Sequence, residues 1–199
     1  SDAGLAPVDA VAELEQVAAR YAVAVTPELV ALIDPADPAD PIARQFIPSA
    51  DELVEQPGEN ADPIGDDARS PVGGIVHRYP DRVLFKLVHV CAVYCRFCFR
   101  REMVGPGKAS ALSDDAYRAG LDYIRSHPEI WEVILTGGDP LMLSPRRLAE
   151  IMADLAAIDH VKIIRIHSRV PIADPERINP EMIAALRVEG ATTCGRERG

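Results

Sequence analysis

The chain has 199 residues, of which 48% are hydrophobic and 26% charged, and its formal net charge is −10. This composition is typical of an ordinary soluble protein of one or two domains. No stretch approaches the run of about 18–20 uncharged apolar residues that crosses a bilayer, so no membrane partner is expected.

The charge is distributed unevenly along the chain. Residues 1–70 hold 15 acidic and 3 basic side chains, whereas residues 71–199 hold 16 and 18. A nucleic-acid-binding protein would present a basic face, so nucleic acid is not an expected partner. We interpret the acidic leader as a solvated surface, and docking of a basic partner is the alternative.

The start, Ser1-Asp2-Ala3, lacks a basic region followed by an apolar core, so no secretory signal is expected.

The leader is expected to be partly helical and partly irregular. Apolar residues recur at three- and four-residue steps over 8–24, which predicts a helix. Thr26-Pro27 is typical of a helix start and predicts a short helix to about Ile33. Residues 34–69 are rich in Pro, Asp and Gly and are expected to be irregular, with Phe46-Ile47-Pro48 as the apolar anchor onto the body.

Strands and helices alternate from residue 75 onward. The predicted strands cover 75–79, 83–90, 131–136 and 161–167, and the predicted helices cover 113–125, 144–157 and 180–188. This alternation predicts an α/β fold with parallel strands, right-handed crossovers and loops gathered at the carboxyl ends of the strands. We therefore expect two parts, a leader over 1–74 and a (βα) domain over 75–199.

Three cysteines follow the predicted strand 83–90, and their spacing is C-x3-C-x2-C: Cys91, Cys95 and Cys98. Thiolates this close can all face one metal centre. Iron–sulfur clusters most often take four cysteine ligands, so a [4Fe–4S] cluster held by three would keep one iron open to a small molecule. Structural zinc is the alternative, although zinc prefers four ligands and Cys194 lies far away. A disulfide would leave one of the three thiols over.

Two other loops follow parallel strands and are expected to meet the cysteine loop. Gly137-Gly138-Asp139-Pro140 comes after the strand 131–136, and His167-Ser168-Arg169 comes after the strand 161–167. The carboxyl ends of parallel strands lie at one edge of a sheet. The three loops together therefore predict a single site.

These motifs resemble those of the radical S-adenosylmethionine (SAM) enzymes and, among them, the lysine 2,3-aminomutase family. The matching stretches are 91–101, 136–142 and 165–171, and the resemblance extends from roughly Asp34 to Arg187. It implies the N-terminal part of a partial (βα) radical SAM barrel, preceded by a mostly helical or irregular leader.

The resemblance also implies roles for individual residues. Cys91, Cys95 and Cys98 would bind a [4Fe–4S] cluster whose open iron chelates SAM. Gly137, Gly138 and Asp139 resemble the glycine-rich loop beside the methionine end of SAM, where glycines let the backbone approach a ligand.

Basic side chains are implied around the same mouth. Arg100 resembles the arginine that meets the substrate carboxylate, for which a planar guanidinium is suited. Arg165, His167 and Arg169 would line the mouth, and Arg169 could instead brace a loop. Phe97 and Phe99 would pack around the cluster or the adenine, with ordinary core packing as the alternative.

The implied reaction moves the α-amino group of L-lysine to its β-carbon. A 5′-deoxyadenosyl radical removes the β-hydrogen, and pyridoxal phosphate (PLP) carries the amine. A related branch, which the motifs resemble equally, acts on lysine destined for elongation factor P. The implied partners are lysine, an electron donor and, as an open option, a second copy of the chain. An oxygen-sensitive centre and few cysteines favour a reducing cytoplasm.

The C-terminal stretch departs from the family pattern. The family's PLP lysine and the acids that hold the substrate ε-ammonium lie further along than Gly199, and Lys86, Lys108 and Lys162 do not match that lysine's context. Residues 189–199 are polar and glycine-rich where a further strand is expected. We therefore expect a truncation or a shifted reading frame near Ala191.

Overall fold

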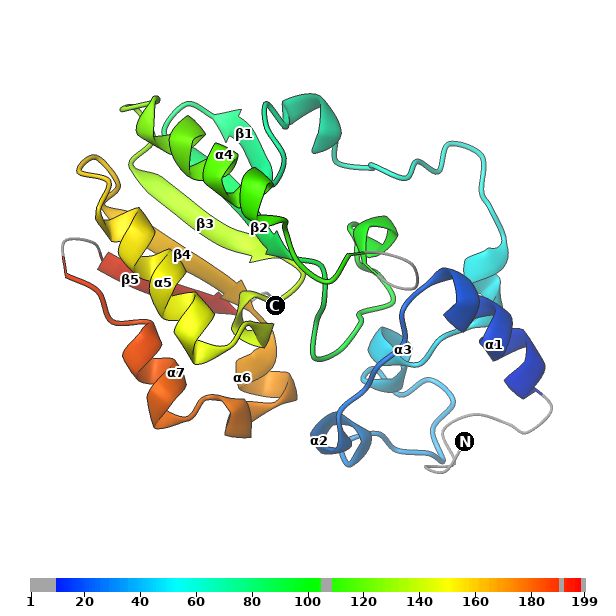
Figure 1. Ribbon diagram of the computed structural model, residues 1–199. Coiled ribbons are helices and arrows are strands. Elements are labelled where there is room, and N and C mark those ends of the chain that lie inside the picture. The colour runs from blue at the N-terminus through cyan, green and yellow to red at the C-terminus, as the bar shows by residue number, and fades with distance from the viewer. Residues whose placement is uncertain (1–9, 105–108, 190–191, 198–199) are drawn as a thin grey trace.

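A five-stranded sheet in the order β1-β2-β3-β4-β5 forms the centre of the protein, seen here in a computed structural model that describes residues 10–104, 109–189 and 192–197 (Figure 1). The strands are β1 (Ile75–Tyr79), β2 (Arg82–Val88), β3 (Glu132–Gly137), β4 (Ile163–Ser168) and β5 (Thr192–Glu197). β1 pairs with β2 in the antiparallel sense, and all other pairs are parallel. The predicted α/β fold with parallel strands is confirmed.

Helices cover one face of this sheet, as Figure 1 shows for α4 (Asp114–Arg125) and α5 (Pro145–Ala156). The Ser113 hydroxyl caps α4 by accepting from the Ala116 N–H at 3.3 Å, and Ser144 caps α5 by accepting from Arg147 N–H at 3.3 Å. α7 (Pro180–Ala185) follows, with the Asn179 side chain as its cap. Capping satisfies amide groups that have no partner inside the helix, which fixes where each helix begins.

The core lies between the sheet and these helices. Phe85 is fully buried, and its ring stacks on Tyr117 of α4 with centroids 5.7 Å apart. Gly120 allows this approach, because a Cβ there would lie 2.8 Å from the Phe85 ring. Strands β3 and β4 contribute the fully buried Leu135 and Ile164. Buried and half-buried residues alternate along β4, whereas Glu132 to Thr136 of β3 are all buried, as expected for a central parallel strand.

The C-terminal stretch differs from the expectation. Residues 192–197 form β5, which pairs in the parallel sense with β4 from Ile163↔Thr192 to Ser168↔Glu197. The Thr192 N–H donates to Lys162 O at 2.8 Å. Backbone groups on the edge of β4 accept a neighbour whatever its side chains, so a strand forms despite the polar composition. The expected truncation or shifted reading frame stays a prediction.

The leader consists of short elements joined by turns. Its helices are α1 (Val11–Arg20), α2 (Pro27–Val30) and α3 (Ala43–Phe46), with 3₁₀ turns at Ala50–Leu53 and Asp67–Arg69. The helix predicted over 8–24 is shorter at its C-terminal end, and residues 8 and 9 lie outside the described part. Phe46 is 4% exposed and packs with Leu29, Val93 and Ala173, which confirms it as an apolar anchor. The boundary near residue 74 stays a prediction.

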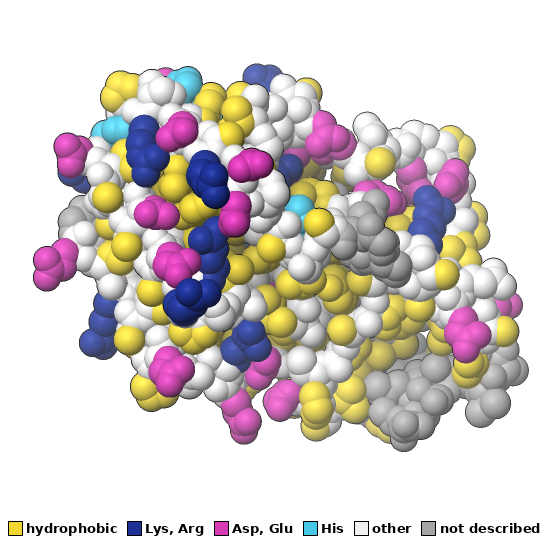
Figure 2. Space-filling view, viewed as in Figure 1, with side chains coloured by type: hydrophobic (Ala, Val, Ile, Leu, Met, Phe, Trp, Pro, Cys, Tyr) yellow, Lys and Arg dark blue, Asp and Glu magenta, His cyan; other side chains and the backbone are white. Residues whose placement is uncertain are grey.

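The surface over the helices is charged but mixed. Figure 2 shows acidic and basic side chains interspersed on this face, without a continuous basic patch. Among the described helices, none is both long and apolar enough to cross a membrane.

Replacing Phe85 by alanine should lower the free energy of unfolding by about 3–5 kcal/mol, the usual cost of removing a fully buried aromatic ring. Tyr79→Ala is the matched control, because Tyr79 is 59% exposed and should cost little. Urea denaturation followed by circular dichroism measures both. Equal effects of the two changes would contradict this description of the core.

Candidate functional site

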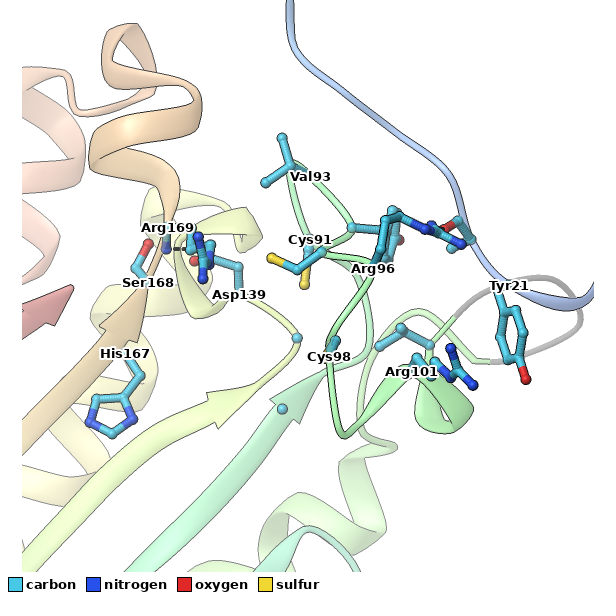
Figure 3. Close-up of a pocket in the computed structure, with 16 residues that line it drawn as sticks. Tyr21, Cys91, Val93, Arg96, Cys98, Arg101, Asp139, His167, Ser168 and Arg169 are labelled. Atoms are coloured by element: carbon cyan, nitrogen blue, oxygen red, sulfur yellow. Dashed lines mark hydrogen bonds between the residues drawn. The ribbon is translucent and has the colours of Figure 1, made fainter. Parts of the chain in front are cut away.

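The three cysteines lie on the loop that leaves β2, between the sheet and the leader (Figure 3). Cys91, Cys95 and Cys98 are all half-buried, and all three line one pocket. The same pocket is lined by residues from the loops after β3 and β4 and from the leader: Tyr21, Ala22, Gly137, Gly138, Asp139, His167, Ser168 and Arg169. The predicted meeting of three strand ends at one place is therefore present in the structure.

Gly137 and Gly138 bring the end of β3 against the end of β2. Gly137 has φ +111°, in the left-handed region that favours glycine. A Cβ on Gly138 would clash with the Val90 carbonyl oxygen and would lie 2.7 Å from Val90 N. The Gly138 N–H donates to Val88 O at 2.5 Å, and the Asp139 N–H donates to Val90 O at 2.8 Å. Close backbone packing is thus a reason for both glycines beyond the predicted approach of SAM, which stays a prediction.

Asp139 joins the loops after β3 and β4. Its carboxylate is 4% exposed and accepts from Leu141 N–H at 3.0 Å and from Arg169 N–H at 2.7 Å, the dashed contact in Figure 3. A buried carboxylate is stable where backbone amides satisfy it. Asp139 therefore links the loops after β3 and β4 and holds the backbone of Arg169 beside the cysteine loop.

Arg169 itself faces that loop. Its guanidinium carbon lies 5.6 Å from the centre of the Phe97 ring, within the range of a cation–π interaction. Phe97 is 58% exposed and Phe99 is 41% exposed. The alternative that these two rings belong to an ordinary core is therefore wrong.

Arg165 lies elsewhere than expected. It lies on β4, two residues before His167, and pairs with Glu132 of β3. Its Nε and Nη2 lie 2.6 Å and 2.5 Å from Glu132 Oε1. Arg82 Nη1 lies 3.3 Å from the other oxygen of the same carboxylate. Glu132 is only 1% exposed, so this network ties three strands together away from the pocket. Of the four basic side chains predicted around the mouth, His167 and Arg169 line the pocket, whereas Arg100 and Arg165 are not among the lining residues.

Arg100 is buried beside the leader. It is 5% exposed, and its Nε and Nη2 lie 3.0 Å and 2.9 Å from Asp66 Oδ2. Within the described residues, its Nη1 is buried without a hydrogen-bond partner. Sequence reasoning did not find Asp66, since a single aspartate in an irregular acidic leader carries no distinguishing signal.

The set of three local thiols suits a cluster with one open iron better than a zinc ion, which prefers four ligands. Among the described residues, no three His, Cys, Asp or Glu side chains are placed to hold one metal ion. In a [4Fe–4S] cluster each cysteine binds a different iron, so the sulfurs need not converge on one point. A three-cysteine loop at the rim of a pocket fits that group.

Burial also affects two tyrosines that line the pocket, one from the cysteine loop and one from the leader. Tyr94, between Cys91 and Cys95, has a raised pKa because burial disfavours the phenolate. Burial likewise raises the pKa of Tyr21, whose ring lies 4.3 Å from the Arg101 guanidinium. Both phenols therefore stay neutral near pH 7.

Comparison with known proteins identifies the class. Residues 85–193 match the radical SAM superfamily, and the chain belongs to that family. Within it, the chain is 44% identical over 164 residues to an L-lysine 2,3-aminomutase of Clostridium subterminale, a match covering 82% of this chain and 39% of that protein.

Two other relatives give the same picture. An L-lysine 2,3-aminomutase of Methanococcus maripaludis is 40% identical over 176 residues, covering 88% of this chain and 40% of that protein. A glutamate 2,3-aminomutase of Clostridioides difficile is 37% identical over 174 residues, covering 87% and 41%. The chain thus spans about two fifths of the length of these relatives, and the resemblance seen in the motifs is confirmed.

Gly138→Ala should disturb the cysteine loop, because the added Cβ meets the backbone of Val90 directly before Cys91. We expect a loss of about 1–3 kcal/mol in unfolding free energy, the usual cost of overpacking, together with lower iron content after reconstitution. Gly73→Ala is the control, since its Cβ would lie 3.3 Å from Ala116 Cβ and a small shift relieves that contact. Iron content equal to that of the control would refute the close-packing explanation.

Proposed function

We propose that this chain provides the cluster- and SAM-binding part of a radical SAM aminomutase that acts on L-lysine. The observation that carries the proposal is that three cysteines and the loops after two further parallel strands open onto one pocket. Two of the three relatives described above are named L-lysine 2,3-aminomutase, which supports lysine as the substrate, and the third is named glutamate 2,3-aminomutase. The cytoplasm is the proposed location, because its thiols and iron centres are kept reduced.

The residues that line the pocket would have separate roles. Cys91, Cys95 and Cys98 would ligate three irons and leave the fourth open to SAM. Asp139 and Arg169 would form the opposite wall of the pocket, with Arg169 presenting a fixed positive charge. When bound, the cluster and SAM supply a carbon radical that abstracts hydrogen from the substrate. The half-buried pocket would shield that chemistry from water.

Arg100 would bind the carboxylate of the amino-acid substrate. Asp66 occupies Nε and one terminal nitrogen, which leaves Nη1 as a buried donor that has no partner among the described residues. A buried donor without a partner is costly, and a substrate carboxylate would satisfy it with a charge-assisted hydrogen bond.

PLP is the second proposed cofactor, and when bound it would stabilise the migrating amine. Lys86 lies on a strand, at the register position opposite Thr136, rather than on one of the loops around the pocket. Lys108 and Lys162 do not match the context of the family's PLP lysine either, so we assign that lysine to the part of the relatives' length that this chain does not cover. Lysine destined for elongation factor P is the alternative fate of the product, and adding that protein to the assay separates the two.

Anaerobic reconstitution followed by electron paramagnetic resonance tests the proposal. We expect a reduced [4Fe–4S] signal that changes when SAM is added, and reductive cleavage of SAM to 5′-deoxyadenosine. Cys95→Ala should abolish both, because only two of the ligands would remain. A signal that ignores SAM, or bound zinc without iron, would instead indicate a non-catalytic metal module and overturn the assignment.

The substrate role of Arg100 has its own test on the complete protein. Arg100→Lys should lower kcat/KM for β-lysine formation by about tenfold or more, because a hydrogen bond between charged groups contributes roughly 1.5–3 kcal/mol. Arg118→Lys is the control, as the Arg118 side chain is 70% exposed on α4. Unchanged kinetics with an intact cluster signal would remove Arg100 from the substrate site.

A further inference from the structure

Arg96 stands inside the cysteine motif, between Cys95 and Cys98, and points toward the leader (Figure 3). Its Nε donates to Glu52 Oε1 at 2.9 Å and its Nη2 donates to Glu52 Oε2 at 2.7 Å. The two side chains are only 9% and 12% exposed. This paired geometry is the strongest form of an arginine–carboxylate contact.

Glu52 is itself fixed in the leader. It lies in the 3₁₀ turn Ala50–Leu53 and forms a capping box with Ser49, whose N–H donates to Glu52 Oε1 at 3.1 Å. Arg101, three residues after Cys98, places Nη1 3.7 Å from Glu52 Oε2. The Glu52 carboxylate therefore contacts Arg96, which lies within the cysteine motif, and Arg101, which lies just after it.

The backbone of the leader supports the same loop. The Arg96 N–H donates to Gln45 O at 2.8 Å, and the Tyr94 N–H donates to Ala24 O at 3.2 Å. The third guanidinium nitrogen of Arg96 donates to Ala22 O at 2.8 Å. The conformation that presents the cysteines is thus held by leader residues that are remote in sequence.

We propose that Glu52 is a positioning residue for the metal cluster, a role that rests on the proposed cluster site. Glu52 would act through Arg96 and Arg101, since both arginines line the pocket and Glu52 does not. It would keep the three thiols at the spacing that the cluster needs, and it would neutralise the arginine charge next to the cluster.

Holding the loop and neutralising the arginine charge would change different measurable properties of the cluster. Loss of the tether would speed the release of iron, because the loop could open. Loss of the neutralising charge would make the cluster easier to reduce, since an uncompensated cation favours the more negative reduced form. A merely structural ion pair would lower thermal stability without moving the reduction potential.

Glu52→Gln is the informative variant, because it keeps the size of the side chain and removes its charge. Glu55→Gln is the matched control, since it removes one carboxylate three residues away in a pair with Arg20 whose acidic side chain is 73% exposed. Exposed pairs of this kind contribute little. Each protein is reconstituted anaerobically, and iron and sulfide content, the rate of iron transfer to a chelator and the cluster midpoint potential are measured.

We expect Glu52→Gln to release iron about tenfold faster than Glu55→Gln, the factor that a lost charged hydrogen bond predicts, and to show a more positive midpoint potential. Glu52→Asp keeps the charge but shortens the reach, so it should release iron faster at a nearly unchanged potential. It also serves as the test if Glu52→Gln fails to fold.

The outcomes separate this inference from the proposed function. If the unaltered protein holds no cluster, the proposed function fails. If the unaltered protein holds a SAM-responsive cluster and the Glu52 variants match Glu55→Gln in release rate and potential, the positioning role alone is overturned.

Discussion

Two carbonyl groups at the end of β2 hold the site together. Val88 O and Val90 O accept from the backbone N–H groups of Gly138 and Asp139, at 2.5 Å and 2.8 Å. Val90 directly precedes Cys91, so the cysteine loop starts from a point fixed to β3. Asp139 then carries the connection to β4 through the Arg169 N–H. Backbone contacts, rather than side-chain packing alone, thus set where the three loops meet.

The leader supplies the other side of the cysteine loop. Val93 of that loop packs with Phe46 of α3 and with Ala173 of α6 (Val170–Ala173). The leader is therefore not only a solvated acidic surface, because its residues contact and support the segment that carries the cysteines. Its unusual density of Asp and Pro is compatible with this role, since Asp caps turns and Pro stiffens them. Asp40 shows this, as its carboxylate accepts from Ile42 N–H and Ala43 N–H.

Periodicity and motif spacing predicted much of this structure. The alternation of strands and helices identified the parallel sheet, because buried parallel strands appear as short apolar runs and the helices between them show helical spacing. The cysteine spacing and the Gly-Gly-Asp loop identified the site, and both line the pocket.

Contacts between distant positions could not be predicted in the same way. Glu52 and Arg96 are 44 positions apart. The local spacing Ser49-x-x-Glu52 predicts a capping box, but it does not indicate that Glu52 also pairs with Arg96. Arg165 was misplaced for a related reason: its partner Glu132 lies on a neighbouring strand, and the pairing register that joins them is not visible in the sequence. β5 was missed because main-chain pairing along an open edge needs no apolar pattern.

The antiparallel β1 has a consequence for how far the sheet can curve around on itself. β2 is the first parallel strand, and both of its edges are already paired, to β1 and to β3. A continuous ring of parallel strands requires the last strand to bond to the first. Further strands beside β5 would extend the sheet, but none of them could close it into a barrel by pairing in parallel with β2. Any closure of the sheet would have to use the other edge of β1, whose direction is opposite to that of β2.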